Sequence, residues 1–145
     1  MQRRHFLTAS LAASAATLAR RVAAQPSGRA REFYQIRRYA LTNGSQIKLT
    51  EGYLNDALIP ALAKMGMGPV GAFQLEFGSE TPVYYVLIPG PSSAALVELD
   101  LTLGKDEAFL KAAEPFWSAP ATANAFERVE YSILEAFEGW PKLVP

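Results

Sequence analysis

Residues 33–44 read Phe-Tyr-Gln-Ile-Arg-Arg-Tyr-Ala-Leu-Thr-Asn-Gly, and this stretch decides the fold. From Phe33 to Leu41, aromatic and aliphatic residues are interleaved with arginines, a pattern typical of a β-strand. The next three residues, Thr42-Asn43-Gly44, are a turn signal. Ser45 follows at a position suited to capping a helix. The sequence therefore predicts a domain that opens with a strand and leads at once into a helix.

The residues after Ser45 repeat apolar side chains at the helical period. These residues are Ile47, Leu54, Leu58, Ala61, Leu62 and Met65. Pro60 cannot sit undisturbed in such a helix, because proline lacks the backbone donor and clashes with the preceding turn. We expect a kink or break near Ile59, with Pro60 starting a short second helix that ends around Gly66.

The rest of the chain predicts two strands, a helical region and a final strand. The expected strands are 70–77, 83–88 and 126–137; the expected helices run from Ser92 or Ser93 to Gly104 and from Asp106 to Ala113, where Pro115 stops the second. The order β-α-β-β-α-β predicts an α+β, ferredoxin-like fold, with a four-stranded antiparallel sheet and both helices on one face. The other face is then open, and such faces usually meet a second copy of the chain.

The N-terminus predicts export. Arg3-Arg4-His5-Phe6-Leu7 matches the twin-arginine consensus, and a short, weakly hydrophobic stretch follows it up to Ala19. Residues 1–24 are therefore interpreted as a twin-arginine signal peptide, 25–31 as a flexible leader and 32–142 as the domain. Residues 6–19 are too few to span a bilayer. We expect a periplasmic or extracellular protein with no membrane anchor after cleavage.

Composition excludes several classes of chemistry. The 145 residues contain no cysteine, and the single histidine is His5, inside the predicted signal. Catalytic triads that use histidine, histidine-ligated haem and the common zinc sites are thus excluded from the mature chain, and we expect no metal site and no cofactor. Four of the 14 basic residues lie in the signal, which leaves 10 basic against 14 acidic residues and a net charge of −4. Nucleic acid and anionic lipid are not expected as partners.

Three segments together resemble the NIPSNAP family. Residues 33–39 resemble its opening strand, usually Tyr-Glu-Leu-Arg-x-Tyr; 60–71 are similar to its helix end and following turn, and 136–142 to its domain end. The resemblance covers residues 32–142 and implies a dimeric α+β barrel, in which two sheets pack face to face. It implies no defined reaction. Gln35 stands where the family commonly has glutamate, which weakens any acid–base role at that position.

Strand alternation suggests which polar side chains could gather on the open face. The predicted group is Gln35, Arg37, Tyr39, Gln74, Glu76 and Glu130. One interpretation is a ligand site in which Arg37 holds an anionic or carbonyl group and a carboxylate, Glu76 or Glu130, orients it. The other is a polar layer that satisfies its own hydrogen bonds across a dimer interface. The candidate ligand-binding residues are thus Arg37, Tyr39, Gln74, Glu76 and Glu130, and no residue is predicted to be catalytic.

Two functions remain open from the sequence. The first is a small dimeric binding or interaction module, itself the partner of a second copy, which takes a small hydrophobic or anionic ligand. The second is a cofactor-independent monooxygenase or isomerase that acts on a hydrophobic aromatic substrate. The second rests only on analogy with other families that share the dimeric α+β barrel.

Overall fold

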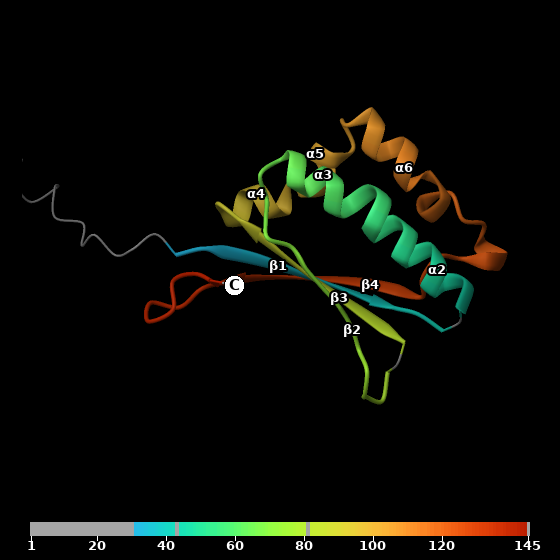
Figure 1. The fold of residues 1–145 in the computed structure, drawn as a ribbon, viewed down its shortest axis with the longest axis horizontal. Helices are drawn as coiled ribbons and strands as arrows, with labels where there is room; N and C mark the ends of the chain where they lie inside the picture. Colours follow the sequence, from blue (N-terminus) through green and yellow to red (C-terminus); the bar gives the residue numbers. More distant parts are fainter. Residues whose placement is uncertain (1–30, 43, 81, 145) are drawn as a thin grey trace, which may run out of the picture. The chain divides into compact units, whose positions relative to one another are not determined.

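The computed structural model describes residues 31–42, 44–80 and 82–144. They form a four-stranded sheet with helices packed against one of its faces (Figure 1). The predicted signal, with Arg3 and Arg4, and residues 25–30 of the predicted leader lie outside the described residues.

The four strands are β1 (Phe33–Ala40), β2 (Gly71–Gln74), β3 (Val83–Gly90) and β4 (Arg128–Glu135). They are antiparallel and lie in the order β2-β3-β1-β4, so β1 and β3 are central. This is the strand order of the ferredoxin-like fold, and the predicted α+β class is confirmed. The predicted strands 70–77 and 126–137 are each longer than the observed β2 and β4, which end at Gln74 and Glu135.

The first helical stretch runs through three segments: α2 (Gly44–Gly52), a π-helical segment (Tyr53–Leu58) and α3 (Ile59–Lys64). Pro60 lies in the first turn of α3, where its missing donor is tolerated. The predicted break near Ile59 is confirmed, and it takes the form of a wider π-helical turn. Gly66 ends α3 with a φ of 71°, a conformation that favours glycine.

The second helical stretch consists of α4 (Ser93–Val97), α5 (Leu99–Leu103) and α6 (Glu107–Trp117). Ser92 caps α4, because its hydroxyl accepts a hydrogen bond from the Ala95 amide at 3.1 Å. The expectation that Pro115 stops the last helix is wrong, since α6 continues through it to Trp117. Phe116 is buried and stacks on Tyr53 with ring centroids 4.3 Å apart, and this packing holds the last turn in place.

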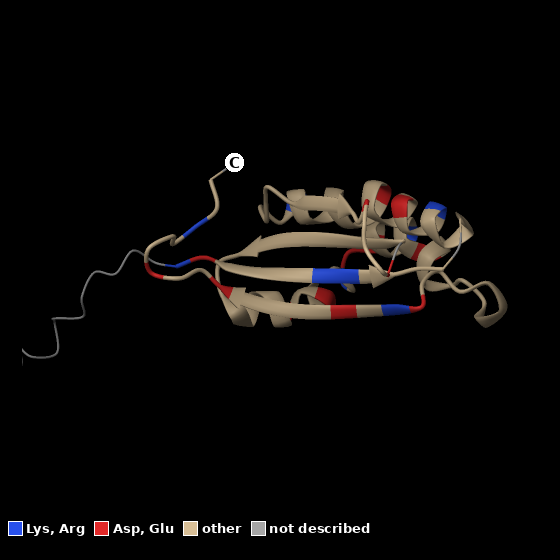
Figure 2. Ribbon diagram, turned by 90° about the horizontal axis from the view of Figure 1, so that it is seen from below, with Lys and Arg blue, Asp and Glu red and all other residues tan. Residues whose placement is uncertain are grey.

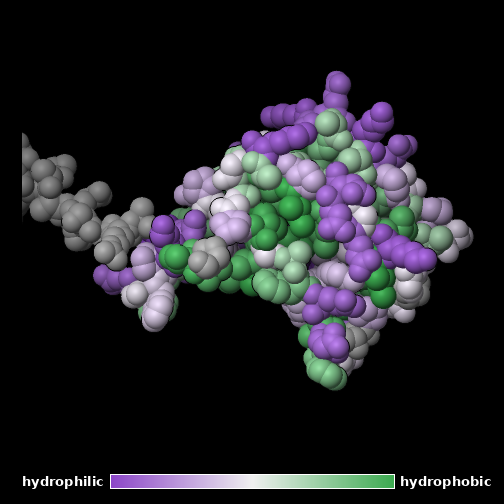
Figure 3. Space-filling view, viewed as in Figure 1, coloured by the Kyte–Doolittle hydropathy of each residue, from purple (hydrophilic) through white to green (hydrophobic). Residues whose placement is uncertain are grey.

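The core lies between the helices and the sheet. Its fully buried side chains include Leu58 and Leu62 from the first helical stretch, Leu99 from α5, and Val86 and Ile88 from β3. Hydrophilic side chains cover the outer side of the helices, and hydrophobic residues show between the helices and the sheet (Figure 3). No helix in the part of the chain that the structure describes is long and apolar enough to cross a membrane.

Figure 2 looks onto the other face of the sheet, which helices do not cover. The strand register places Ile36 of β1 beside Leu87 of β3, and Arg38 beside Tyr85. The same register places Arg38 beside Glu130 of β4. We call this surface the open face.

Candidate functional site

The polar side chains of β1 point toward the helices. Gln35 is 3% exposed, and Arg37 and Tyr39 are both fully buried, whereas their neighbours on the opposite side of the strand are partly exposed. The prediction that these three residues line the open face is therefore wrong. Both faces of β1 carry an arginine and a tyrosine, so alternation alone did not distinguish them. The helical layer decided the orientation, because it supplies the hydrogen-bond partners that a buried arginine needs.

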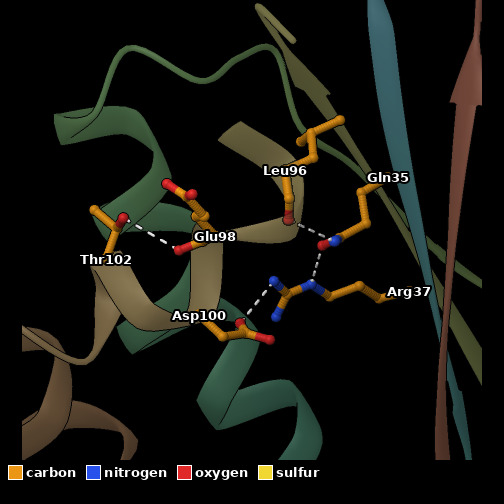
Figure 4. Close-up of polar contacts among 6 residues, drawn as sticks. All are labelled: Gln35, Arg37, Leu96, Glu98, Asp100 and Thr102. Carbon is orange, nitrogen blue, oxygen red and sulfur yellow. Dashed lines mark hydrogen bonds and ion pairs between the residues drawn. The ribbon is translucent and has the colours of Figure 1, made fainter. Parts of the chain in front are cut away.

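Arg37 reaches from β1 into the space beside α4 and α5 (Figure 4). Its Nη2 donates to Asp100 Oδ1 at 2.8 Å, and its Nε donates to Gln35 Oε1 at 2.6 Å. Gln35 in turn donates from Nε2 to the Leu96 carbonyl at 3.0 Å. The guanidinium is thus tied to both short helices and to its own strand. Asp100, which pairs with it, is 50% exposed.

Three tyrosines lie near Arg37 and influence its charge. Tyr39 comes from β1, Tyr53 from the π-helical segment and Tyr131 from β4. The Tyr131 ring lies over the guanidinium, with its centroid 4.6 Å from Arg37 Cζ. The rings of Tyr39 and Tyr53 are 6.3 Å apart. We call Gln35, Arg37, Tyr39, Tyr53, Asp100 and Tyr131 the buried polar cluster.

Three polar atoms of the buried polar cluster have no hydrogen-bond partner among the described residues. They are Arg37 Nη1 and the hydroxyl oxygens of Tyr39 and Tyr53. Tyr39 is fully buried and Tyr53 is 2% exposed, so solvent at the surface does not serve them. Buried polar groups that lack a partner are rare in folded proteins, and each costs roughly 1–3 kcal/mol. Their gathering at one place marks this cluster as the candidate site.

Burial keeps the tyrosines of the cluster protonated. Desolvation raises the pKa of Tyr39 to about 12, although the nearby Arg37 charge opposes the shift. Desolvation likewise raises the pKa of Tyr53 and of Tyr131, and the negative charge of Asp100 adds to the shift of both. Burial opposes the charge of Arg37, but Tyr39 and Asp100 favour it, and the pKa of Arg37 is raised. At neutral pH the cluster therefore presents hydrogen-bond donors.

The other predicted site residues lie apart from this cluster. Gln74, at the end of β2, is exposed and lines a hollow of about 280 Å³ together with Glu51 and Tyr84, on the helix side of the sheet. Glu76 is exposed and lies beyond the end of β2. Among the described residues, no ion pair joins Arg37 to Glu76 or Glu130. The predicted carboxylate partners of Arg37 are thus wrong, and Asp100 takes that place.

Glu130 belongs to the open face. Its carboxylate accepts a hydrogen bond from Arg38 Nη1 at 2.8 Å, and Arg38 also pairs with Glu80. Ile36, Arg38, Tyr85, Glu130 and Ser132 are among the residues that line a hollow of about 540 Å³ there. The open face thus combines an ion-pair network, formed by Arg38 with Glu80 and Glu130, with apolar neighbours.

Sequence reasoning missed Asp100, Tyr53 and Tyr131 as members of the site. The register pairs Arg37 with Tyr131, so correct strand alignment would have placed both on one face. A buried arginine also requires a carboxylate nearby, and Asp100 is the acidic residue of α5. No comparable pattern in the sequence indicated Tyr53, because the direction of its side chain depends on the π-helical turn.

The chemistry of the buried polar cluster suits binding more than proton transfer. The tyrosines hold their protons strongly, and the Asp100 carboxylate is engaged by Arg37. Removal of a proton from a substrate requires a base whose pKa lies near the working pH. The cluster can instead donate hydrogen bonds to an oxygen atom of a ligand.

Comparisons with known proteins bear on the fold. Neither the models of known protein families nor the curated proteins contain a match to this chain. Solved structures do match. A NIPSNAP family protein of unknown function from Agrobacterium tumefaciens strain C58 aligns with a TM-score of 0.57 at 20% identity, over 78% of this chain and 95% of that one.

Two further structures agree with the first. A second NIPSNAP family protein from the same Agrobacterium strain has a TM-score of 0.60 at 18% identity, over 77% of this chain and 91% of its own. An uncharacterized NIPSNAP domain protein from Burkholderia xenovorans has a TM-score of 0.52 at 13% identity, over 70% and 91%. At these identities the likeness concerns the fold and assigns no reaction. The described domain therefore has the ferredoxin-like fold of these NIPSNAP structures.

Proposed function

We propose that this chain is an exported member of the NIPSNAP family that works as a small homodimeric binding module. The open face carries the proposal. Helices leave this face uncovered, and large apolar side chains are exposed on it: Phe73 of β2 is 57% exposed and Leu134 of β4 is 44% exposed. An apolar face of this kind is stabilised when another surface covers it.

The charges of the open face favour a second copy as the covering surface. Arg38, near the end of β1, and Glu130 of the edge strand β4 lie side by side on neighbouring strands. When two such faces meet about a twofold axis, Arg38 of each copy can approach Glu130 of the other. Opposite charges arranged in this way make a surface complementary to itself. This is the face-to-face arrangement that the family resemblance implies.

Sedimentation analysis of the purified protein tests the dimer. We expect a species of twice the chain mass at micromolar concentration, and we expect Ile36→Lys to convert it to a monomer. Lysine at this position would place a second positive charge beside Arg38 in the interface, where unpaired charge is costly. Leu101→Lys is the matched control, because Leu101 is 71% exposed on α5, on the opposite side of the sheet.

A parent protein that stays monomeric at this concentration would refute the dimer. So would an Ile36→Lys variant that remains dimeric to the same degree as the parent and the Leu101→Lys control. Circular dichroism of each variant shows whether the fold is retained, so that loss of the dimer is not confused with unfolding.

A further inference from the structure

The hollow of about 280 Å³ on the helix side of the sheet offers open space beside polar groups. It lies at the edge of the sheet, between residues 51–59 of the first helical stretch and the edge strand β2, and Tyr84 of β3 also lines it. We call it the β2 hollow. Its volume is close to the lower end of the usual range for ligand sites, about 300 Å³, so it has room for a small molecule.

The β2 hollow carries a negative charge without a counter-charge. Among its described lining residues only Glu51 is charged, and no described lysine or arginine forms an ion pair with it. The Tyr84 hydroxyl donates to Glu51 Oε1 at 2.6 Å. Desolvation and this hydrogen bond raise the pKa of Tyr84 to about 12, so the hydroxyl keeps its proton at neutral pH and orients the carboxylate. A cation is the complementary ligand charge.

The edge of β2 adds hydrogen-bond acceptors to this charge. The Leu75 amide donates to the Val83 carbonyl at 2.8 Å, which makes these two residues a hydrogen-bonded pair of the antiparallel ladder. Main-chain groups alternate in direction along such a strand, so the carbonyls of Ala72 and Gln74 point away from β3, toward the free edge. Both residues line the β2 hollow, and so does Asn55, whose side-chain oxygen is a further acceptor.

These features select the head and the body of a ligand. A primary ammonium group combines a positive charge with three N–H donors, and it therefore matches one carboxylate surrounded by carbonyl oxygens. Leu54 and Ile59 supply the apolar part of the wall; Leu54 is buried and Ile59 is partly buried. A short alkyl chain gains by packing against such side chains.

We infer that the β2 hollow binds a primary ammonium group carried on a short alkyl chain. The ammonium donates hydrogen bonds to Glu51 and to the acceptors at the edge of β2, and the alkyl chain packs on Leu54 and Ile59. This assignment deepens the proposed function, because it names a ligand class and rests on the chain being a binding module. It does not depend on the dimer, since the β2 hollow lies on the opposite side of the sheet from the open face.

Three probes with the same alkyl chain test the head group. Butylamine carries a primary ammonium, butyltrimethylammonium carries the charge without N–H donors, and butyrate carries a carboxylate. Each is titrated into the purified protein at constant ionic strength and followed by backbone amide NMR. We expect saturable shifts at β2 and at residues 51–59 with butylamine. The affinity for each of the other two should be at least about tenfold lower, a difference of about 1.4 kcal/mol.

A fourth probe distinguishes the two sources of such a group. Nα-acetyl-lysine methylamide presents the same ammonium and alkyl chain on a peptide backbone. Tighter binding of this compound than of butylamine would identify a lysine side chain as the ligand, and weaker binding would identify a free amine.

Glu51→Gln tests the carboxylate, because glutamine keeps the size of the side chain and an oxygen for Tyr84. The change should weaken butylamine binding at least about tenfold, a loss of about 1.4 kcal/mol. Asp56→Asn is the matched control: Asp56 is exposed on the neighbouring π-helical segment and is not among the described residues that line the hollow, so binding should not change. The comparison of probes needs no variant, and it remains decisive if Glu51→Gln does not fold.

Three outcomes would overturn the inference: no saturable shifts with butylamine, equal affinity for butylamine and butyrate, or unchanged butylamine affinity in a folded Glu51→Gln variant. Sedimentation of the same samples separates this failure from that of the proposed function. A dimer that does not bind butylamine removes the ligand assignment alone, whereas a monomer removes the dimeric module.

Discussion

Arg37 is buried to a different degree from the carboxylate it pairs with. Arg37 is fully buried, while half of the Asp100 side chain contacts solvent. When one partner of such a pair is removed, the cost depends on which charge is left behind. A remaining Asp100 can be hydrated in place, but a remaining Arg37 cannot. The two residues should therefore respond unequally to substitution.

Asp100→Ala should destabilise the domain strongly, because it leaves a buried guanidinium without its counter-charge. The expected loss is at the lower end of ~3–5 kcal/mol, since Asp100 itself is half exposed. Asp100→Asn, which keeps an oxygen for Arg37 Nη2, should lose less. Urea unfolding of the three proteins gives the comparison. Equal stability of the parent and Asp100→Ala would mean that Arg37 is not held by this pair.

A second residue-scale prediction concerns pH and Glu127. Hydrogen bonds from Gln46 and Asn124 lower the pKa of Glu127 below its ordinary value of 4.5, and Thr42 adds a smaller effect. Because the pKa is lower in the folded state, this stabilisation is present above pH 4.5 and is lost as the pH falls through the folded value.

Glu127→Gln removes the ionisable group, so the variant should lack this pH dependence. We expect the parent to be the more stable of the two at pH 7, and the difference between them to shrink as the pH falls below about 4.5. Chemical unfolding of both proteins between pH 7 and pH 3 measures it. A difference that stays constant across this range would contradict the assigned shift.

At the scale of the elements, the two adjacent serines at the start of α4 have different roles. Only Ser92 caps the helix in the structure; Ser93 is its first residue and is exposed. Ser92→Ala should therefore cost about 1 kcal/mol of folding free energy, and Ser93→Ala much less. The pair forms its own control, because both changes remove one hydroxyl from neighbouring positions. Equal effects in thermal unfolding would show that the cap at Ser92 does not stabilise the domain.

The two prolines in the helices show where a local sequence signal is enough to predict a helix boundary and where it is not. Pro60 acted as its chemistry predicts, and α3 begins beside it. Pro115 did not, because the burial of Phe116 against Tyr53 outweighs the lost hydrogen bond. A proline ends a helix only when no tertiary contact beyond it is strong enough to retain the next turn.

At the scale of the whole molecule, the N-terminal sequence predicts export by the twin-arginine route. Replacing Arg3 and Arg4 with lysine should leave precursor in the cytoplasm, because the twin-arginine route reads that pair. Cell fractionation with detection of precursor and mature forms measures the outcome. Replacing Arg20 and Arg21 with lysine is the matched control, since this second pair lies after the apolar stretch, and export should continue. Normal appearance of the mature form after the Arg3 and Arg4 change would show that another route is used.

By itself, the sequence determined the α+β class, the order of the elements and their positions. These features follow from local periods and from residues such as Gly66 and Pro60, which constrain the backbone wherever they stand. The likeness to NIPSNAP proteins was likewise carried by short segments, and the fold of the solved NIPSNAP structures agrees with it.

Only the tertiary structure decided which side of β1 is buried. Both sides carry an arginine and a tyrosine, so the alternation is the same for either choice. The choice depends on Asp100 and Leu96, which lie more than sixty residues away and reach Arg37 and Gln35 only when α4 and α5 pack on the sheet. A buried charge is oriented by the partners that the folded chain brings to it, and a linear sequence does not show which partners these are.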